Sequence, residues 1–180
     1  NLSLDYERVL QTGLLSLKEK ATEYQARVID AIIGLCDRYK EEAAKMGRND
    51  IVEVLTQVPR YKARNFYEAL QFFRILHYSL WLEGDYHNTV GRFDMYMYPY
   101  LEADMKKGLY TEETALELLE DFFISFNKDS DIYPGVQQGD NGQSMVLGGA
   151  DLDGNYHFNT LSKLCLIASR NLKLIDPKIN

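Results

Sequence analysis

Apolar residues recur at three- and four-residue spacing along the first quarter of this chain, which is the pattern of a helix with one buried face. The sequence predicts that this helix begins at Leu4 after an N-cap at Ser3, bends at Gly13 and continues to Met46, where Gly47 stops it. Charged residues occupy the other faces. The stripe that we expect to be buried comprises Val28, Ile29, Ile32, Leu35, Cys36 and Tyr39.

The segments that follow lead to the most apolar helix of the chain. A short helix capped by Asn49 or Asp50 should end before Pro59, because the residue before a proline disfavours helical geometry. Residues 66–82 then carry apolar or aromatic side chains around nearly the whole helix circumference. A helix of this kind is buried on several sides, so we expect it to have neighbours on more than one face.

Two further helices are predicted in the middle of the chain. Asp94–Lys107 has helical character despite Pro99, which either kinks the helix or marks its true start, and Gly108 ends it. Thr111 should cap the next helix, whose first turn carries acidic residues that suit the positive end of the helix dipole. The buried stripe of this second helix should be Ala115, Leu118, Leu119, Phe122, Phe123 and Phe126.

The last third of the chain predicts a loop, one strand, a turn and a final helix. Residues 127–141 are polar and glycine-rich, and a loop of this length in a compact domain is usually functional or disordered. Gln143–Leu147 is the best strand candidate, Asp151–Asn155 is a turn, and Asn159 can cap a helix that extends to Leu172. The expected fold class is therefore mostly α in this segment, with one or two short strands.

Composition supports a globular protein and excludes some partners. The 180 residues are 46% hydrophobic and 26% charged, which is enough for one domain with a core. The net charge is −7 and the basic residues are scattered among acids, so we expect no nucleic-acid partner. No apolar run approaches the ~18 residues of a membrane span, and no signal peptide opens the chain, so we expect no membrane contact and a cytoplasmic location.

The cysteines and histidines narrow the candidate chemistry. Cys36 and Cys165 lie in apolar helical stretches and are expected to be reduced and buried, without a base to activate them. None of the histidines has metal-ligand spacing with another His or Cys, so no metal site is predicted. His77 is expected to be a hydrogen-bonded core residue. His87 lies in a polar run between apolar segments and is the better candidate for substrate contact or proton transfer.

Three other local patterns favour structural roles. Arg92 and Asp94 flank Phe93 and can fix their loop through charge-assisted hydrogen bonds. Asp151-x-Asp-Gly-Asn155 is similar to a calcium loop, but the required Gly and Glu positions hold Tyr156 and Ser162, so a plain turn is favoured. The glycine-containing run 139–144 lacks the lysine of a phosphate loop and precedes a strand instead of following one.

Five blocks occur in a fixed order between Ala63 and Pro177, and with the segments Asp5-Tyr-Glu-Arg-Val-Leu10 and Gly13-Leu-Leu15 they cover essentially the whole chain. They are Ala63-Arg-Asn-Phe-Tyr-Glu-Ala-Leu-Gln71, Gly91-Arg-Phe-Asp-Met-Tyr-Met-Tyr-Pro-Tyr100, Asp104-x-x-x-Gly108 with Thr111-x-Glu-x-Ala115, Gly142-Gln-Ser-x-x-Leu-Gly-Gly149, and Asn159-x-Leu-Ser162 with Leu174-x-x-Pro177. Together they resemble the glycyl radical enzymes related to pyruvate formate-lyase and glycerol dehydratase. The resemblance implies that this chain is part of a ten-stranded α/β barrel wrapped in helices.

The resemblance also implies a reaction. In that family a cysteine at the barrel centre becomes a thiyl radical by taking the radical from a glycine near the C-terminus. A separate activase, which contains an iron–sulfur cluster and uses S-adenosylmethionine, installs the glycyl radical. The expected chemistry is cleavage of a C–C, C–O or C–N bond of a small metabolite, in a formate acetyltransferase-like or diol dehydratase-like reaction of anaerobic metabolism.

By the same resemblance, two places in this chain reach the substrate cavity. His87-Asn88 is the nearest match to a polar His-Ser pair of diol-dehydrating members, although the register of residues 84–90 relative to the family stays open. Gln143-Ser144, at the start of the predicted strand, helps to shape the pocket. The residues expected to be architectural are Gly91, Arg92 and Asp94.

The family's Gly-Cys loop and its C-terminal glycyl loop have no match in these residues. The chain also begins with Asn1 and ends at Ile175–Asn180 without a polar tail. We therefore expect residues 1–180 to be an internal fragment of the lyase domain, with no catalytic residue and no cofactor of its own, and inert in isolation. Its partners would be the rest of the polypeptide, the radical-activating enzyme, a small-molecule substrate and a second subunit in a homodimer. The alternative is a non-catalytic helical interaction or scaffold module derived from that fold.

Overall fold

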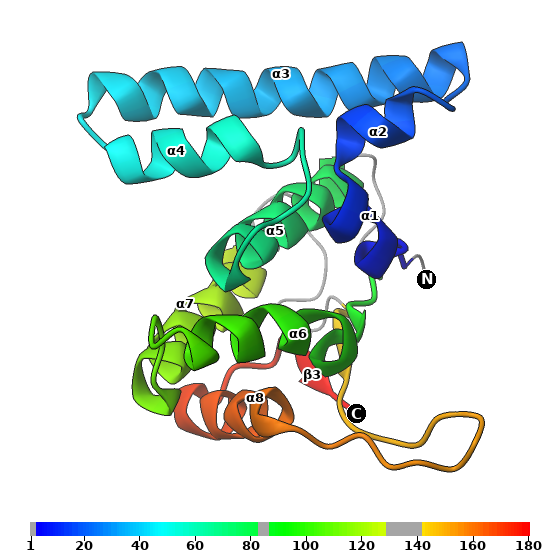
Figure 1. Ribbon diagram of the computed structural model, residues 1–180, viewed down its shortest axis with the longest axis vertical. Helices are drawn as coiled ribbons and strands as arrows, with labels where there is room; N and C mark the ends of the chain where they lie inside the picture. The colour runs from blue at the N-terminus through cyan, green and yellow to red at the C-terminus, as the bar shows by residue number, and fades with distance from the viewer. Residues whose placement is uncertain (1–2, 83–86, 129–141) are drawn as a thin grey trace. The chain divides into compact units, whose positions relative to one another are not determined.

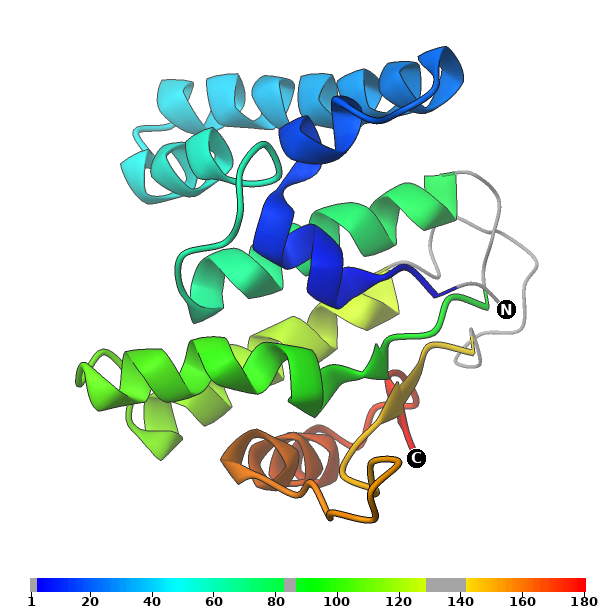
Figure 2. The same ribbon diagram turned by 45° about the vertical axis from the view of Figure 1, so that its right-hand side comes forward.

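The computed structural model describes residues 3–82, 87–128 and 142–180. The chain forms two compact units, one of residues 5–79 and one of residues 80–180 with the residues up to Leu4. We refer to them as the N-terminal unit and the C-terminal unit. Figures 1 and 2 show their helices and strands coloured along the chain.

The N-terminal unit begins with three helices where we expected one long helix: α1 (Tyr6–Thr12), α2 (Leu14–Lys18) and α3 (Glu23–Lys45). The first N-cap is Asp5 and not Ser3, since the Asp5 carboxylate accepts a hydrogen bond from the Arg8 amide at 3.2 Å. Thr22 starts a separate helix because its side chain and that of Gln25 form a capping box. The prediction missed this Thr-x-x-Gln signal.

Gly13 lies where α1 ends and α2 begins, at the position where we expected a bend. Its φ is +82°, a conformation that side chains disfavour. The amide of Leu14 donates to the Pro59 carbonyl at 2.9 Å, which brings two backbone segments together. A Cβ at Gly13 would lie 2.5 Å from the carbonyl carbon of Tyr61. Both the backbone conformation and the close approach therefore require glycine.

Helix α4 (Asn49–Gln57) runs back along α3, as Figure 1 shows. Its N-cap is Arg48, whereas we expected Asn49 or Asp50. The Asp50 carboxylate instead binds the Arg48 guanidinium, with Oδ2 2.7 Å from Nη2. The buried face of α3 is narrower than predicted, because the short helices α2 and α4 cover only part of it: Tyr39 is 57% exposed, and the buried residues are Ile33, Cys36 and Ala43.

Helix α5 (Phe66–Leu82) has the predicted extent and burial. Asn65 Oδ1 accepts from the Glu68 amide at 2.8 Å, and the Glu68 carboxylate accepts from the Arg64 amide at 2.8 Å, so polar side chains satisfy the first turn. His77 is fully buried, and its Nδ1 is 3.0 Å from the hydroxyl of Tyr6, which confirms the predicted hydrogen-bonded core histidine. The buried apolar residues of α5 before Ser79 are Phe66, Ala69, Leu70, Phe72, Phe73 and Leu76.

The C-terminal unit packs α6 (Phe93–Lys106), α7 (Glu112–Lys128) and α8 (Thr160–Leu172) around aromatic side chains. Helices α7 and α8 lie side by side, and α6 also contacts α8 (Figures 1 and 2). The rings of Phe93 and Phe122 stack with centroids 5.4 Å apart, and Phe126 meets Phe122 edge-on at 5.0 Å. Pro99 lies inside α6, so it does not mark the start of that helix.

The predicted caps of α7 and α8 are confirmed. The Thr111 hydroxyl accepts from the Thr114 amide at 3.2 Å, and Asn159 Oδ1 accepts from the Ser162 amide at 3.0 Å. Helix α7 continues to Lys128, beyond the expected start of the loop, and the remainder of that predicted loop lies outside the described residues. The cap side chains thus fix where both helices begin.

Three short parallel strands complete the described part of the C-terminal unit: β1 (Gly91–Arg92), β2 (Ser144–Val146) and β3 (Lys178–Ile179), in the order β1-β2-β3. The expected strand at Gln143–Leu147 is β2. We did not predict β1 and β3, because two residues carry no readable periodicity. The fold class, mostly helical with a few short strands, is confirmed.

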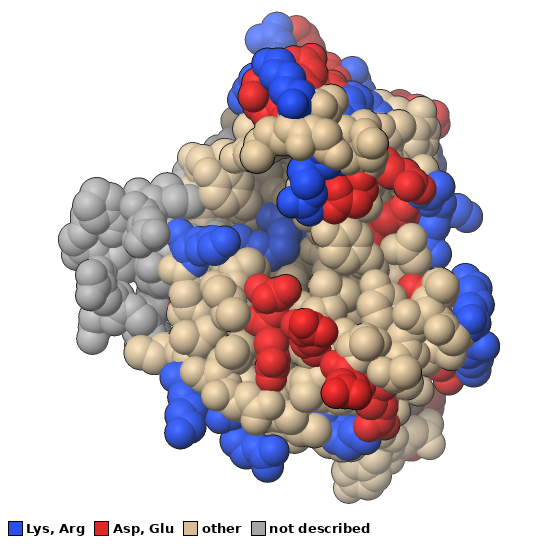
Figure 3. Space-filling view, turned by 90° about the vertical axis from the view of Figure 1, so that its left-hand side faces the viewer, with Lys and Arg blue, Asp and Glu red and all other residues tan. Residues whose placement is uncertain are grey.

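The surface agrees with the scattered charges of the sequence. On the face shown in Figure 3, Lys and Arg side chains are interspersed with Asp and Glu. Among the described residues, no helix combines the length and the hydropathy that a transmembrane span requires. The same residues contain no cluster of His, Cys, Asp and Glu side chains that could hold a metal ion.

Replacing Gly13 by Ala should lower the free energy of unfolding by more than about 2 kcal/mol, because the new methyl group overlaps a backbone that cannot move aside. Gly47 is the matched control, since its φ is +71° but no atom lies within 4 Å of the added Cβ. Gly47→Ala should lose only about 1 kcal/mol, the cost of the backbone conformation alone. Denaturant unfolding of both variants measures the difference, and equal losses would contradict the steric explanation.

Candidate functional site

The candidate site lies at the edge of the small sheet where β1 and β2 begin. These strands are parallel neighbours, with Gly91 opposite Met145, and the Val90 amide donates to the Ser144 carbonyl at 2.8 Å. Parallel strands begin at the same edge of a sheet. The residues just before β1 and those at the start of β2 therefore come together there, although more than fifty residues separate them in sequence.

His87 is exposed, and its ring lies directly against Gly142. A Cβ at Gly142 would overlap the imidazole, and the φ of Gly142 is +66°. The glycine therefore gives the backbone the close approach that places His87 beside the start of β2. Asn88, the other member of the predicted pair, is fully buried.

Gln143 and Ser144 differ in how they are held. Gln143 is fully buried, and its Nε2 donates to the Phe126 carbonyl at 3.0 Å and to Asp176 Oδ2 at 3.3 Å. Ser144 is half-buried and pairs through its backbone with the segment that precedes β1. Of the four residues predicted to contact substrate, His87 and Ser144 are thus accessible, while Asn88 and Gln143 are buried beside them.

The opposite end of β2 is held by Arg92 and Asp94. Arg92 Nη2 donates to the Gly148 carbonyl at 2.9 Å, and the Gly148 amide donates to Asp94 Oδ2 at 2.6 Å. We call these three residues the Gly148 clamp. Gly91, at the start of β1, has a φ of +71°, and a Cβ there would lie 3.6 Å from the Ser3 hydroxyl. The residues expected to be architectural therefore surround the β1–β2 pair.

The N-cap of α8 and a residue of its first turn extend the Gly148 clamp and were not predicted to do so. The Ser162 hydroxyl donates to Asp94 Oδ2 at 2.5 Å, and Asn159 Nδ2 donates to the Asp94 carbonyl at 3.1 Å. The sequence shows Asn159 and Ser162 as a helix cap, but the cap pattern contains no signal for a partner 65 residues away. Only the folded chain brings Asp94 to this helix end.

Neither cysteine has the environment of a reactive thiol. Cys36 is buried in the N-terminal unit, and burial raises its pKa to about 11. Cys165 is fully buried in α8, where burial first and the nearby charge of Asp94 second raise the pKa of its thiol well above the ordinary value. Both thiols are free and buried, as predicted.

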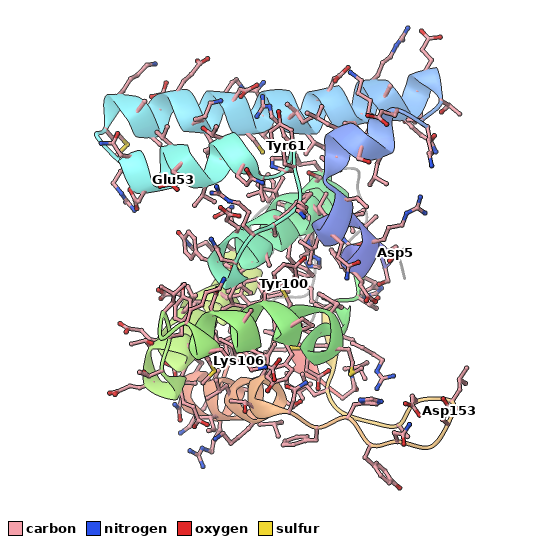
Figure 4. All side chains as sticks on the ribbon, viewed as in Figure 1. Asp5, Glu53, Tyr61, Tyr100, Lys106 and Asp153 are labelled. Carbon is pink, nitrogen blue, oxygen red and sulfur yellow. The ribbon has the colours of Figure 1, made fainter. Side chains whose placement is uncertain are left out.

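Asp151–Asn155 forms a turn, as predicted, and the segment 151–157 is held together by the Asp151 carboxylate. Asp151 Oδ1 accepts from the amides of Asp153 and Asn155 at 2.9 Å, and Oδ2 lies 2.9 Å from His157 Nε2. The hydrogen bond with His157 is the largest of the interactions that lower the Asp151 pKa below its usual range. Figure 4 labels Asp153 at the outer end of this turn. The carboxylate oxygens of Asp151 thus already accept hydrogen bonds from the chain's own donors.

Comparison with known sequences identifies relatives. A family model described as pyruvate formate lyase-like matches residues 1–180. (2S)-3-sulfopropanediol dehydratase of Klebsiella oxytoca is 28% identical over 178 residues, which cover 95% of this chain and 22% of that protein. The glycyl radical subunit of 4-hydroxyphenylacetate decarboxylase of Clostridioides difficile is 32% identical over 142 residues, which cover 76% of this chain and 16% of the subunit.

Solved structures share the fold. The structure solved for 1,2-propanediol dehydration in Roseburia inulinivorans has a TM-score of 0.84 and 28% identity, over 99% of this chain and 27% of its own length. The glycerol-bound form of the B12-independent glycerol dehydratase from Clostridium butyricum has a TM-score of 0.80 and 25% identity, again over 99% of this chain and 27% of its own. Since the family model covers the whole chain and these relatives are glycyl radical enzymes, the chain belongs to the pyruvate formate lyase-like family of glycyl radical enzymes.

Proposed function

We propose that the complete polypeptide containing residues 1–180 is a glycyl radical enzyme that cleaves a C–O, C–C or C–N bond of a small polar metabolite. The observation that carries this proposal is the edge of the β1–β2 pair, where the exposed His87 lies against Gly142, two residues before the half-buried Ser144, in a chain of this family. The chain spans 16% to 27% of the length of the relatives named above. Residues 1–180 are accordingly proposed to be an internal part of the lyase domain.

The chemistry of the two accessible side chains suits a hydroxylated substrate. An imidazole and a hydroxyl can each donate or accept a hydrogen bond, so together they can orient a substrate hydroxyl group. Several relatives are named for the dehydration of such compounds: sulfopropanediol, 1,2-propanediol and trans-4-hydroxyproline. A substrate hydroxyl at this edge is therefore the version of the proposal that the geometry supports best.

Asn88 and Gln143 support the site from within. The Gln143 amide is oriented by the Phe126 carbonyl and by Asp176, so it fixes the start of β2. Asn88 is fully buried two residues before Val90, whose amide pairs with Ser144. Preorganisation of this kind keeps contact groups in place before the substrate arrives.

The radical chemistry would be supplied from outside these residues. The glycyl radical and the reactive cysteine belong to other parts of the complete polypeptide, and a separate activating enzyme installs the radical. Cys36 and Cys165 agree with this division, since both are buried within helices and neither follows a glycine. The contribution of this chain is substrate contact and positioning. A homodimeric assembly is proposed for the complete enzyme.

The rival proposal is a non-catalytic helical scaffold module derived from the same fold. It is motivated by the absence of a poised catalytic group among the described residues. The reading frame that encodes the chain discriminates the two proposals. A continuous frame with a downstream Gly-Cys loop and a C-terminal glycyl motif supports the enzyme, and a frame that ends after Asn180 supports the module.

The decisive experiment activates the complete polypeptide anaerobically with its activating enzyme and S-adenosylmethionine. Electron paramagnetic resonance should then show a glycyl radical. Turnover should follow with one member of a panel of 1,2-propanediol, glycerol, trans-4-hydroxyproline, (2S)-3-sulfopropanediol and 4-hydroxyphenylacetate. Residues 1–180 treated in the same way should show neither radical nor turnover. A complete polypeptide that never acquires a radical would contradict the proposal.

His87→Ala and Ser144→Ala in the activated complete enzyme should each raise KM by about tenfold, because each variant loses one hydrogen bond to the substrate. His157→Ala and Ser125→Ala are the matched controls, since His157 belongs to the 151–157 turn and the Ser125 hydroxyl bonds the Phe122 carbonyl within α7. Steady-state kinetics with the substrate found above measures the effect. Unchanged KM in both site variants would remove His87 and Ser144 from the substrate site.

The thiols of Cys36 and Cys165 should not react with a disulfide reagent in the folded chain at pH 8, because burial raises both pKa values and keeps the thiols protonated. The Cys36 thiolate should form only as the pH approaches 11. Denaturant should release both thiols. Leu152→Cys supplies the positive control, since residue 152 is fully exposed. Rapid labelling of either native cysteine would show an accessible thiol that the structure does not have.

A further inference from the structure

Strand pairing alone cannot set the register of β1 against β2. Strand β1 has two residues and β2 has three, so few backbone hydrogen bonds oppose a shift of one strand along the other. A slip by one residue moves a strand by about 3.3 Å and turns each side chain to the opposite face. Such a slip would carry Gly142 away from His87 and Ser144 away from Val90. Something outside the strands must therefore select the register.

At the end of β2 the Gly148 clamp makes that selection, while the buried Gln143 amide holds the start of the same strand. Arg92 donates to the carbonyl of Gly148 and Asp94 accepts from its amide, so two side chains satisfy both backbone polar groups of one residue. The φ of Gly148 is +66°, which Leu147, one position earlier, would adopt only with strain. A shifted strand would present a different residue to Arg92 and Asp94. The clamp thus fits one register of β2.

The orientation of Asp94 in turn depends on α8. Asp94 is fully buried and directs Oδ2 to both the Gly148 amide and the Ser162 hydroxyl, at 2.6 and 2.5 Å. Within the described residues, its Oδ1 has no hydrogen-bond partner. Ser162 is itself fully buried, and its hydroxyl also accepts from the Asn159 amide at 3.0 Å. Ser162, in the first turn of α8, therefore orients the Asp94 carboxylate toward the Gly148 amide.

We propose that Ser162 is a positioning residue, which acts through Asp94 and the Gly148 clamp to keep the start of β2, with Gly142 and Ser144, beside residues 87–90 at the far edge of the sheet. The effect of Ser162 on substrate binding rests on the proposed function. The effect of Ser162 on the register of β1 and β2 does not depend on that function. Loss of the Ser162 hydroxyl leaves a buried carboxylate with one fewer donor, and the carboxylate then turns away from Gly148. The β1–β2 pair loosens while the helices keep their packing.

The chain contains a matched control for Ser162. Thr114 occupies the same third helical position in α7, where its hydroxyl accepts from the Thr111 amide at 3.0 Å. Thr114→Ala removes this half of a helix cap, as Ser162→Ala does, but Thr114 is exposed and has no contact with Asp94 among the described residues. Ser162→Thr keeps a hydroxyl and is the rescue variant. The comparison separates the cap from the clamp.

Hydrogen exchange on the complete polypeptide, read by mass spectrometry, tests the proposal without any substrate. Ser162→Ala should speed exchange in peptides that cover residues 87–92 and 142–148 by about tenfold, whereas the α7 core should keep its protection. Thr114→Ala should leave both strand peptides unchanged, and Ser162→Thr should restore them. Uniformly faster exchange, or no change at the strands, would overturn the positioning role.

Kinetics gives the second readout on the activated enzyme. Ser162→Ala should raise KM by about tenfold and change kcat by less than about twofold, because the radical chemistry lies elsewhere and substrate contact is lost. If the exchange result appears but KM stays constant, the register claim stands and the assignment of His87 and Ser144 to the substrate is wrong. If neither result appears, Ser162 has no positioning role.

Discussion

The buried carboxylate of Asp94 is the interaction on which the C-terminal unit depends. It lies at the start of α6, binds the amide of Gly148 just past β2 and accepts the hydroxyl of Ser162 in the first turn of α8. A buried carboxylate without donors costs more than the about 1–3 kcal/mol of a neutral unsatisfied group. The elements that supply those donors are therefore held in place together. Arg92 adds a charge-assisted bond to the other side of Gly148.

This arrangement explains how strands of two and three residues can form a defined site. Short strands contribute little pairing, yet the edge where they begin holds His87 against Gly142, two residues before Ser144. The fixed point is at the opposite end of the same strands, in the Gly148 clamp. Because β1 and β2 are so short, holding the pair at the Gly148 clamp also fixes the positions of the residues where the two strands begin. The residues proposed to contact substrate and those of the Gly148 clamp thus occupy different positions of one motif.

Sequence periodicity predicted the long elements well, because their apolar faces repeat over several turns. Helices α5, α6, α7 and α8 and strand β2 are where the pattern placed them. The errors arose where a single local hydrogen bond determines the residue at which a helix begins. Asp5 caps α1 in place of Ser3, and Thr22 with Gln25 begins a new helix inside a continuous apolar stripe. The two-residue strands β1 and β3 exist only through their partner β2, so no local pattern announces them.

The candidate site was placed by ordered motifs and not by periodicity. These motifs predicted that four residues contact substrate: His87, Asn88, Gln143 and Ser144. A motif does not say which of these side chains are accessible and which are buried. The partners of Asp94 were also beyond reach, since Gly148 and Ser162 lie more than fifty residues along the chain. Hydrogen bonds over such separations depend on the assembled fold.

The most direct measurement is a crystal structure of the complete polypeptide with its substrate bound. We predict the His87 ring and the Ser144 hydroxyl within hydrogen-bond distance of the same substrate molecule, with Arg92 and Asp94 both bound to Gly148. A substrate that binds away from the beginning of β1 and β2, or a register in which another residue occupies the place of Gly148, would contradict the function assigned to this edge.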